Sequence, residues 1–268
     1  MGATGTLGRS RSRWSRIRNS EEPNGRRIAV LTGASGGIGE GITESLKAAD
    51  VVVVGISRTE AAATDRWIRC DVSDPEQVDS AVQQVKDVYG RIDILVNAAG
   101  FAQGASLTET SVALWCETID VNLTGTFLMM RRVVPDMACR RWGRIVNVAS
   151  IAASQGEPRM AAFAAATCGV LGLTRSVAHQ VAKSGITVNA ICAGMVEAGR
   201  LDSVAPARGV DQAFETTGLR HHRACSTRPH WRVMEVWEVA DLVAFLVSDD
   251  ARGISGQGID LCDGVVCG

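Results

Sequence analysis

The sequence predicts an α/β domain built on a doubly wound parallel sheet that is flanked by helices. Short apolar runs of strand type recur along the chain, helical stretches separate them, and a glycine-rich turn joins the first run to the first helix. Strands that are joined through helices need crossover connections, which bring the strands together in parallel. Parallel strands are covered on both faces, so their apolar runs are expected to be continuous rather than alternating.

Six strands and four helices can be delimited. The helix that starts at Pro75 has Ser73 or Asp74 available as its amino-terminal cap, and a proline is well tolerated in the first turn. The expected strands cover residues 27–32, 51–56, 67–70, 92–97, 144–149 and 187–192. The expected helices cover residues 40–49, 75–89, about 112–137 and about 159–183.

The composition of the chain changes at about residue 26. Residues 1–25 are rich in Arg, Ser and Gly and have almost no apolar periodicity, so we expect a disordered basic tail rather than a nucleic-acid-binding arm or a transit peptide. Residues 26–268 contain no internal repeat beyond the strand–helix alternation and no linker, so we expect them to form one domain.

Overall composition argues against several classes of function. Hydrophobic residues make up 46% of the chain, enough for a large core, and we find no apolar run long enough to span a membrane. The net charge of −1 gives no reason to expect nucleic acid or a membrane surface as the main partner. The eight cysteines are scattered and form no CxxC pair, so we expect reduced thiols in a cytoplasmic protein and no metal site.

The glycine-rich turn of residues 32–39 (TGASGGIG) predicts a dinucleotide site. Gly33 allows the tight turn, Gly37 removes a Cβ that would block a pyrophosphate, and Gly39 lets the helix pack on the strand. Phosphates would then lie at the positive end of the following helix. The cofactor-binding residues expected here are Gly33, Ser35, Gly37, Ile38 and Gly39.

The second strand ends at Ser57-Arg58, which favours NADP(H) over NAD(H). An acidic residue at this point would bond the adenosine ribose hydroxyls and repel a 2′-phosphate, whereas the Arg58 guanidinium can pair with that phosphate. The alternative is that Arg58 is a solvated surface arginine. Asp71-Val72 and Asn97-Ala98-Ala99-Gly100 follow the third and fourth strands, so they lie at the same edge of the sheet, where open α/β sheets bind ligands.

Together these motifs resemble the classical short-chain dehydrogenases/reductases, most closely the 3-oxoacyl-carrier-protein reductases and polyketide ketoreductases. The resemblance extends from about residue 27 to the carboxyl terminus and implies a Rossmann-type fold of about seven strands, usually in a homodimer or homotetramer. It also implies that Asp71 and Val72 contact adenine, and that residues 97–100 flank the adenosine ribose and brace the central strand. The motifs that carry it are residues 32–39, Asp71-Val72, residues 97–100, Asn122, Ser150 and residues 254–257.

The same resemblance identifies the catalytic positions. In the family a tyrosine donates a proton to the carbonyl, a lysine four residues later lowers the pKa of that tyrosine, a serine polarises the carbonyl and an asparagine helps to hold a water-mediated proton path. Ser150 and Asn122 match the serine and the asparagine. The tyrosine position, thirteen residues after Ser150, is Phe163, and the lysine position is Thr167.

These two replacements remove the usual proton relay. Phe163 has no ionisable hydroxyl, and Thr167 carries no charge. Because positions i and i+4 share one helix face, both changes affect the same corner of the site. General acid catalysis contributes about 10²–10⁴-fold, so a standard ketoreductase mechanism is not expected. Ala193-Gly194 also replaces the family's Pro-Gly, and Asp263-Gly264-Val265 its closing Asp-Gly-Gly.

Other residues could supply a proton. His221, His222 and His230 lie in the variable segment of about residues 195–233, which covers the substrate in relatives, although histidines in a polar loop are more often solvated. Cys168 is expected to be a small packing residue rather than a nucleophile, and Gln155 a polar contact.

The sequence is compatible with three functions. The first is an enzyme with altered chemistry, which reduces an activated electrophile such as an iminium or a conjugated enone, or performs a non-redox step, on a small molecule or a carrier-bound acyl chain in natural-product metabolism. The second is an inactive subunit that pairs with an active paralogue through the helices expected at residues 112–137 and 159–183. The third is a sensor that binds NADP(H) without turnover.

Overall fold

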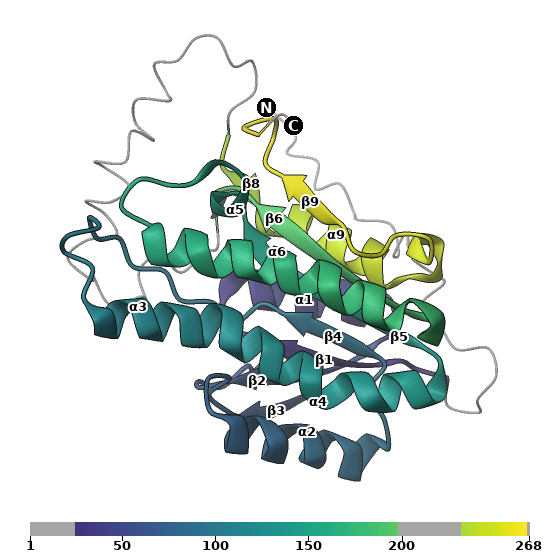
Figure 1. Cartoon of the computed structure of the whole chain (residues 1–268). Helices are drawn as coiled ribbons and strands as arrows, with labels where there is room; N and C mark the ends of the chain where they lie inside the picture. Colours follow the sequence, from purple (N-terminus) through teal and green to yellow (C-terminus); the bar gives the residue numbers. More distant parts are fainter. Residues whose placement is uncertain (1–24, 198–231, 267–268) are drawn as a thin grey trace, which may run out of the picture.

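The computed structural model describes residues 25–197 and 232–266 (Figure 1). The basic tail up to residue 24 and the segment of residues 198–231, with its three histidines, lie outside the described residues. The long strands are β1 (Ile28–Thr32), β2 (Val52–Ser57), β3 (Arg66–Arg69), β4 (Ile94–Asn97), β5 (Gly143–Ser150), β6 (Ile186–Ala193) and β9 (Gly258–Leu261).

These strands form one seven-stranded parallel sheet in the order β3-β2-β1-β4-β5-β6-β9. The chain runs outward from β1 to β3 and then returns to the other side of β1 with β4, so the two halves diverge between β1 and β4. The doubly wound Rossmann-type fold is therefore confirmed, and the point of divergence is where such sheets bind ligands. The six strands that the sequence predicts lie within two residues of their expected bounds.

Helices cover both faces of the sheet (Figure 1). Their bounds are α1 (Gly37–Ala48), α2 (Pro75–Tyr89), α3 (Val112–Ile119), α4 (Gly125–Arg140), α5 (Ala152–Gln155), α6 (Ala161–Val181) and α9 (Val236–Val247). One buried cluster joins the sheet to α1 and α9, and a second joins it to α2, α4 and α6. Helices α1, α2, α4, α6 and α9 each turn apolar residues toward the sheet, and this burial is the main source of the stability of the fold.

The helix expected at residues 112–137 is interrupted. A short π-helix, η1 (Asp120–Thr124), separates α3 from α4 and contains Asn122. The Asn122 amide reaches outside the helix, donating to the Phe101 carbonyl at 2.7 Å and accepting from the Phe101 backbone N–H at 3.2 Å. Single π-turns of this kind are frequent at functional sites.

We expected no apolar run long enough to span a membrane, and that expectation is wrong. The stretch Ala161–Ser184, which contains α6, is long and apolar enough to do so. In the structure, however, α6 packs on β5 and β6, and its Thr174 hydroxyl accepts a hydrogen bond of 2.9 Å from Asn147 in the core. One face of α6 therefore belongs to the core of the domain, and 33% of the apolar stretch is buried.

Two short strands, β7 (Val196–Glu197) and β8 (Met234–Glu235), pair in parallel beside the carboxyl end of β6. Glu235 is also the amino-terminal cap of α9, where it forms a capping box with Glu238. In this pair Val196 stands opposite Met234 and Glu197 opposite Glu235.

Candidate active site

The glycine turn after β1 has the geometry that its sequence predicts. Gly33 has a φ of +67°, and a Cβ there would lie 2.5 Å from the Ala98 carbonyl oxygen. A Cβ on Gly39 would lie 2.3 Å from the Gly33 carbonyl oxygen, so α1 approaches the turn more closely than a side chain allows. Helix α1 begins at Gly37, and its cap Gly36 offers no side-chain hydrogen bond to the first amides. These amides can therefore receive an anionic group.

Ser57 stabilises the loop that follows β2. Its hydroxyl is buried, donates to the Thr59 carbonyl at 2.6 Å and accepts from the Trp67 indole N–H at 3.1 Å. The Thr59 hydroxyl donates in turn to the Ser35 hydroxyl at 2.8 Å, which ties this loop to the glycine turn. Arg58, between them, is exposed. Ser57 thus shapes the loop, and Arg58 is available to a ligand.

Arg69 is a second basic residue at this point, and sequence reasoning missed it. It is the last residue of β3, stands opposite Ser57 in the parallel register and is exposed. Arg69 could have been found from the expected pairing of the second and third strands, because the carboxyl ends of neighbouring parallel strands meet at one edge.

Asp71 and Val72 follow β3 in a compact turn. One carboxylate oxygen of Asp71 accepts from the Ser73 backbone N–H at 3.0 Å and from the Ser73 hydroxyl at 2.7 Å. Val72 is buried, and a Cβ on Gly125 would lie 2.8 Å from one of its methyl groups. Asp74, rather than Ser73, caps α2 by accepting from the backbone N–H groups of Glu76 and Gln77.

Asn97 lies inside the core. Its amide nitrogen donates to the Asn147 side-chain oxygen at 2.8 Å, which joins β4 to β5. The next two residues are fixed by the Thr32 hydroxyl, which accepts from the N–H groups of Ala98 and Ala99 at 3.1 Å each. The chain after β4 is therefore held against β1 on one side and β5 on the other.

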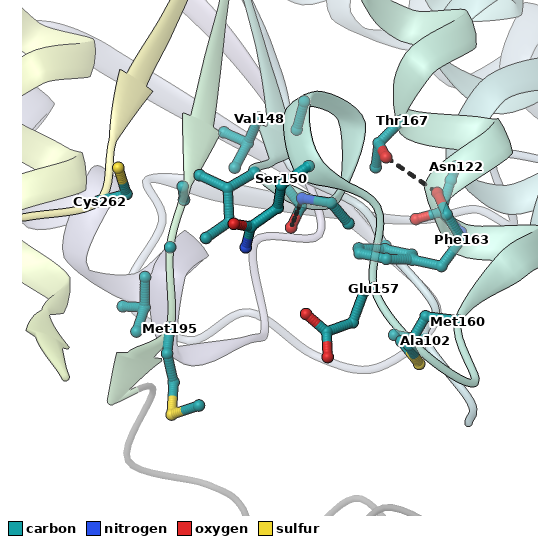
Figure 2. A pocket seen from close by; sticks show the side chains of 18 of the residues that line it. Ala102, Asn122, Val148, Ser150, Glu157, Met160, Phe163, Thr167, Met195 and Cys262 are labelled. Carbon is teal, nitrogen blue, oxygen red and sulfur yellow. Dashed lines mark hydrogen bonds between the residues drawn. The ribbon is translucent and has the colours of Figure 1, made fainter. Parts of the chain in front are cut away.

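A cavity of about 600 Å³ opens at the carboxyl ends of β4, β5 and β6 (Figure 2). Most of its lining is apolar. It brings together eight of the sequence-predicted site residues: Ile38, Ala98, Ala99, Gly100, Asn122, Ser150, Phe163 and Thr167. The remaining predicted residues do not line it; they are Gly33, Ser35, Gly37, Gly39, Ser57, Arg58, Asp71, Val72 and Asn97. Most of this second group lies along the same edge of the sheet, at the ends of β1 to β3.

The polar groups inside the cavity are few. Ser150 ends β5, and its hydroxyl accepts from the Ala152 backbone N–H at 3.2 Å, leaving its own proton free to donate. The Asn122 amide is occupied by the Phe101 backbone and by the Thr118 carbonyl, to which it donates at 2.8 Å. Asn122 is therefore a structural part of the cavity wall, whereas the Ser150 hydroxyl can bond to a ligand.

Phe163 and Thr167 stand one turn apart on α6 and both face the cavity (Figure 2). Thr167 is buried, and its hydroxyl donates to the Phe163 carbonyl at 2.9 Å and lies 3.1 Å from the Ala164 carbonyl. This corner of the cavity consequently carries a phenyl ring and a hydroxyl turned back into its own helix. It offers neither a charge nor an ionisable proton donor.

Sequence reasoning missed Glu157, which lies in the loop between α5 and α6. Figure 2 shows its carboxylate extending into the cavity between Phe163 and Met195. Among the described residues it is the only carboxylate that lines the cavity. Arg232 also lines it, but its guanidinium is held by Glu238 in two contacts of 2.7 Å. No motif marks Glu157, so only the loop geometry reveals it.

The structure also bears on the expectations for Cys168, for Gln155 and Gly194, and for metal binding. Cys168 was expected to be a small packing residue rather than a nucleophile; it is exposed, and its thiol donates to the Ala153 carbonyl at 3.1 Å. Gln155 and Gly194 line the cavity. In the described part of the chain the cysteines are free, and no group of three or more His, Cys, Asp or Glu residues could hold a metal ion.

Comparisons with known proteins agree with this geometry. Residues 33–265 match a family described as enoyl-(acyl carrier protein) reductase. The chain is 35% identical, over 89% of its length and 92% of the relative, to a protein assigned as ketoacyl reductase 1 of the granaticin polyketide synthase of Streptomyces violaceoruber. It is 32% identical, over 89% of its length and 97% of the relative, to the 3-oxoacyl-acyl-carrier-protein reductase FabG of Escherichia coli.

A solved structure shows the same fold. The crystal structure of a variant of the actinorhodin polyketide ketoreductase with NADPH matches with a TM-score of 0.80 and 31% identity, over 90% of this chain and 97% of that chain. The family match covers most of the sequence, and the sheet order, the glycine turn and the cavity agree with it. The chain therefore belongs to the short-chain dehydrogenase/reductase family, in its 3-oxoacyl-carrier-protein reductase and polyketide ketoreductase branch.

Proposed function

We propose that this protein binds NADP(H) and transfers hydride to an electrophile that is already activated, without a protein acid at the usual position. The observation that carries the proposal is the corner formed by Phe163 and Thr167, which both face the cavity. We propose that they stand at the family's tyrosine and lysine positions. Everything else that such a reaction needs is retained: a glycine turn, a shaped apolar cavity and the Ser150 hydroxyl.

The residues at the sheet edge fit the cofactor. The uncapped amides at the start of α1 suit a pyrophosphate, and the exposed guanidinium groups of Arg58 and Arg69 suit a 2′-phosphate. The actinorhodin ketoreductase structure with NADPH, similar over 90% of this chain, supports the same assignment. When bound, the cofactor supplies the hydride. Ile38 and Ala98 to Gly100 would border it where the glycine turn meets the cavity.

The substrate must compensate for the missing relay. An unactivated ketone accumulates alkoxide charge during reduction and needs a proton, which neither Phe163 nor Thr167 can provide. An iminium ion becomes a neutral amine when it accepts hydride, and a conjugated enone delocalises the charge away from the attacked carbon. Both substrates reduce the demand for an enzyme acid. Ser150 would remain as a hydrogen-bond donor that orients the substrate.

Glu157 favours the iminium among these electrophiles. A carboxylate that lines a mostly apolar cavity attracts a cation more strongly than it would in water, because the local dielectric constant is lower. Arg232 lies at the same cavity, where its guanidinium pairs with Glu238. The proposed substrate is therefore a cationic C=N group on an apolar skeleton, either as a small molecule or on a carrier-bound chain, which would share the cavity of about 600 Å³ with the nicotinamide end of the cofactor.

The proposal is tested with a matched set of substrates. Initial rates of NADPH oxidation are measured for a cyclic iminium, a conjugated enone and a ketone of the same skeleton, with wild-type protein and with Glu157→Gln. We expect turnover of the iminium, less of the enone and none of the ketone. Glu157→Gln should raise KM for the iminium about tenfold and leave the enone unchanged, because a charge-assisted contact is lost only for the cation. Turnover restricted to the ketone would refute the proposal.

A second candidate function, a non-catalytic subunit, is favoured by one observation. Large hydrophobic side chains are exposed along α3 and α4, namely Val112, Trp115 and Phe127. Exposed apolar patches of this type mark association surfaces. The chain would then support the site of an active paralogue. Sedimentation of the purified protein, alone and mixed with an active ketoreductase of the same organism, distinguishes the two: the subunit proposal requires a mixed oligomer and no turnover by this chain alone.

A further inference from the structure

The loop between α5 and α6 forms one wall of the candidate active site. From Gln155 to Met160, each residue lines the cavity except Arg159. Glu157, whose carboxylate extends into the cavity, lies two positions before Arg159 (Figure 2). Arg159 therefore stands outside the cavity but belongs to the stretch of chain that carries Glu157 into it.

Residues 157–160 form a tight turn. The Glu157 carbonyl accepts from the Met160 backbone N–H at 3.1 Å, and Met160 is the cap from which α6 begins. Pro158 is the second residue of the turn, and Arg159, the third, has a φ of +63°. Proline followed by a residue of positive φ is the pattern of a type II turn, whose third position usually requires glycine. Arg159 thus holds a backbone conformation that is unusual for its side chain.

The position of this conformation in the fold is also unusual. Four described residues other than glycine have a positive φ, namely Asp50, Arg141, Arg159 and Asp263. Asp50 and Arg141 follow the last turns of α1 and α4, where left-handed residues are common. Arg159 instead precedes the start of α6, so the ending of a helix does not explain it. Such residues persist only where neighbouring contacts fix them, and they concentrate at functional sites.

Contacts with the loop between β4 and α3 hold Arg159 in place. Its carbonyl accepts from the Ala105 backbone N–H at 2.8 Å, and its guanidinium lies 3.6 Å from the Glu109 carboxylate. Glu109 in turn accepts from the Ser106 hydroxyl at 2.6 Å and from the Ser106 backbone N–H at 3.2 Å. These Ser106 hydrogen bonds, with the Arg159 charge, hold the pKa of Glu109 below its ordinary value. Glu109 is therefore an ionised and fixed partner for Arg159 at neutral pH.

We propose that Arg159 is a positioning residue that directs the Glu157 carboxylate into the cavity; this role rests on the proposed function, in which Glu157 recognises a cationic substrate. The left-handed conformation of Arg159 sets the path of residues 157–160, and the contacts with Ala105 and Glu109 keep that path. Arg159 lies outside the cavity and acts through Glu157. It should therefore control the preference for a cation rather than the binding of every ligand.

Calorimetric titration of the NADPH-bound protein with two probes tests the proposal. N-benzylpiperidine is a cation at neutral pH, N-benzoylpiperidine is neutral, and neither accepts hydride, so the result does not depend on turnover. We expect the wild type to bind the cation about tenfold more tightly than the neutral probe. Arg159→Val should lose most of this preference, because a β-branched residue disfavours a positive φ. Arg159→Asn, which tolerates that φ but lacks the charge, should lose about threefold, because an exposed ion pair contributes little.

A matched control separates positioning from backbone strain. Arg141 is an arginine with a φ of +54°, but it follows α4 and precedes β5, whereas the cavity opens at the carboxyl end of β5. Arg141→Val should therefore lower the melting temperature and keep the wild-type preference for the cation. Arg159→Asn should melt close to the wild type, so its change in preference can be measured even if Arg159→Val does not fold.

The outcomes separate this role from the proposed reaction. The positioning role is overturned if both Arg159 variants keep the wild-type preference, if they weaken the binding of both probes equally, or if the wild type shows no preference. Loss of the preference in Arg159→Val, with no iminium reduction by the wild type, would support the positioning role and refute the reaction. An unchanged preference in both variants, with iminium reduction by the wild type, would do the reverse.

Discussion

The Thr167 hydroxyl donates a hydrogen bond of 2.9 Å to the backbone carbonyl of Phe163, one turn earlier on the same helix. The two residues that face the cavity from α6 are thus bonded to each other, and neither presents a charge to a ligand (Figure 2). We propose that these are the positions at which the family's usual chemistry needs a tyrosine and a lysine, so this pair is the centre of the functional proposal.

Restoring the relay should create ketone reduction. In the double variant Phe163→Tyr, Thr167→Lys, we expect the rate of NADPH oxidation with an unactivated ketone to rise by about 10²-fold or more, because general acid catalysis contributes about 10²–10⁴-fold. Neither single variant should gain as much, since the lysine acts through the tyrosine. Buried Thr167 leaves little room for a lysine, so folding is checked by circular dichroism. A correctly folded double variant that binds NADPH and still ignores ketones would count against the assignment of these positions.

Removing the Arg58 guanidinium should change cofactor preference. Arg58→Ala is expected to raise the dissociation constant for NADPH about tenfold and to leave that for NADH unchanged, because only NADPH carries the phosphate that the guanidinium would bind. Arg69→Ala should have the same sign. Nicotinamide fluorescence titrations measure both constants, with Arg66→Ala, at the other end of β3, as the control. Equal losses for the two cofactors would show that Arg58 acts on something other than the 2′-phosphate.

Substitution of Gly33 in the glycine turn should destabilise the protein, because its backbone conformation and its close contacts leave no room for a side chain. Gly33→Ala would place a Cβ 2.5 Å from the Ala98 carbonyl oxygen at a φ of +67°, and we expect it to lower the free energy of unfolding by about 1–3 kcal/mol or more. Gly172→Ala is the matched control, because Gly172 lies inside α6 with no atom within 4 Å of its would-be Cβ. That change should raise the free energy of unfolding by up to about 1 kcal/mol. Urea denaturation of the two variants checks both signs.

Alkaline pH should destabilise the protein through a buried thiol. Burial in the core raises the pKa of Cys192 to about 12, with the Asp260 carboxylate adding to the effect. In the unfolded chain the thiol ionises near its ordinary value of 9.0, so above that pH the unfolded state binds fewer protons than the native state. The stabilisation is complete below about pH 9 and is lost progressively as the pH rises toward 12.

Urea denaturation at a series of pH values between neutral and strongly alkaline measures this loss. Cys192→Ala should show a shallower fall in the free energy of unfolding with pH than the wild type, whatever its absolute stability. The control Cys116→Ala removes an exposed thiol and should keep the wild-type slope. Identical slopes in all three proteins would exclude Cys192 as the source.

Most of the fold could be predicted from the sequence, because its signals are local. Apolar runs mark β1, β2, β4, β5 and β6, the short β3 contains only Trp67 and Ile68 as apolar residues, and the Asp74-Pro75 pair marks the start of α2. The seventh strand, β9, has only four residues and no long apolar run, so only the resemblance to the family suggested it. The break at Asn122 could not be predicted, because it depends on hydrogen bonds to Phe101, which is distant along the chain.

Part of the candidate site could also be predicted, because its motifs are local in the sequence. Motif residues such as Ser150 and Phe163 do meet at one cavity, since the ends of parallel strands share an edge. Glu157 and Arg69 were missed because their places follow from a loop path and from the strand register. Ser57 was assigned to the cofactor, yet its hydroxyl is bonded to Thr59 and Trp67, contacts that no motif reveals.

The most direct test of the central claim is a single-turnover reaction with NADPH that carries deuterium at the transferable position. The protein is mixed with a cyclic iminium and, separately, with the ketone of the same skeleton, and the products are analysed by mass spectrometry. The account predicts an amine that carries one deuterium at the former C=N carbon, and no deuterated alcohol. Deuterated alcohol without deuterated amine would contradict it, because a chain with Phe163 and Thr167 at its reacting corner would then be supplying a proton by another route.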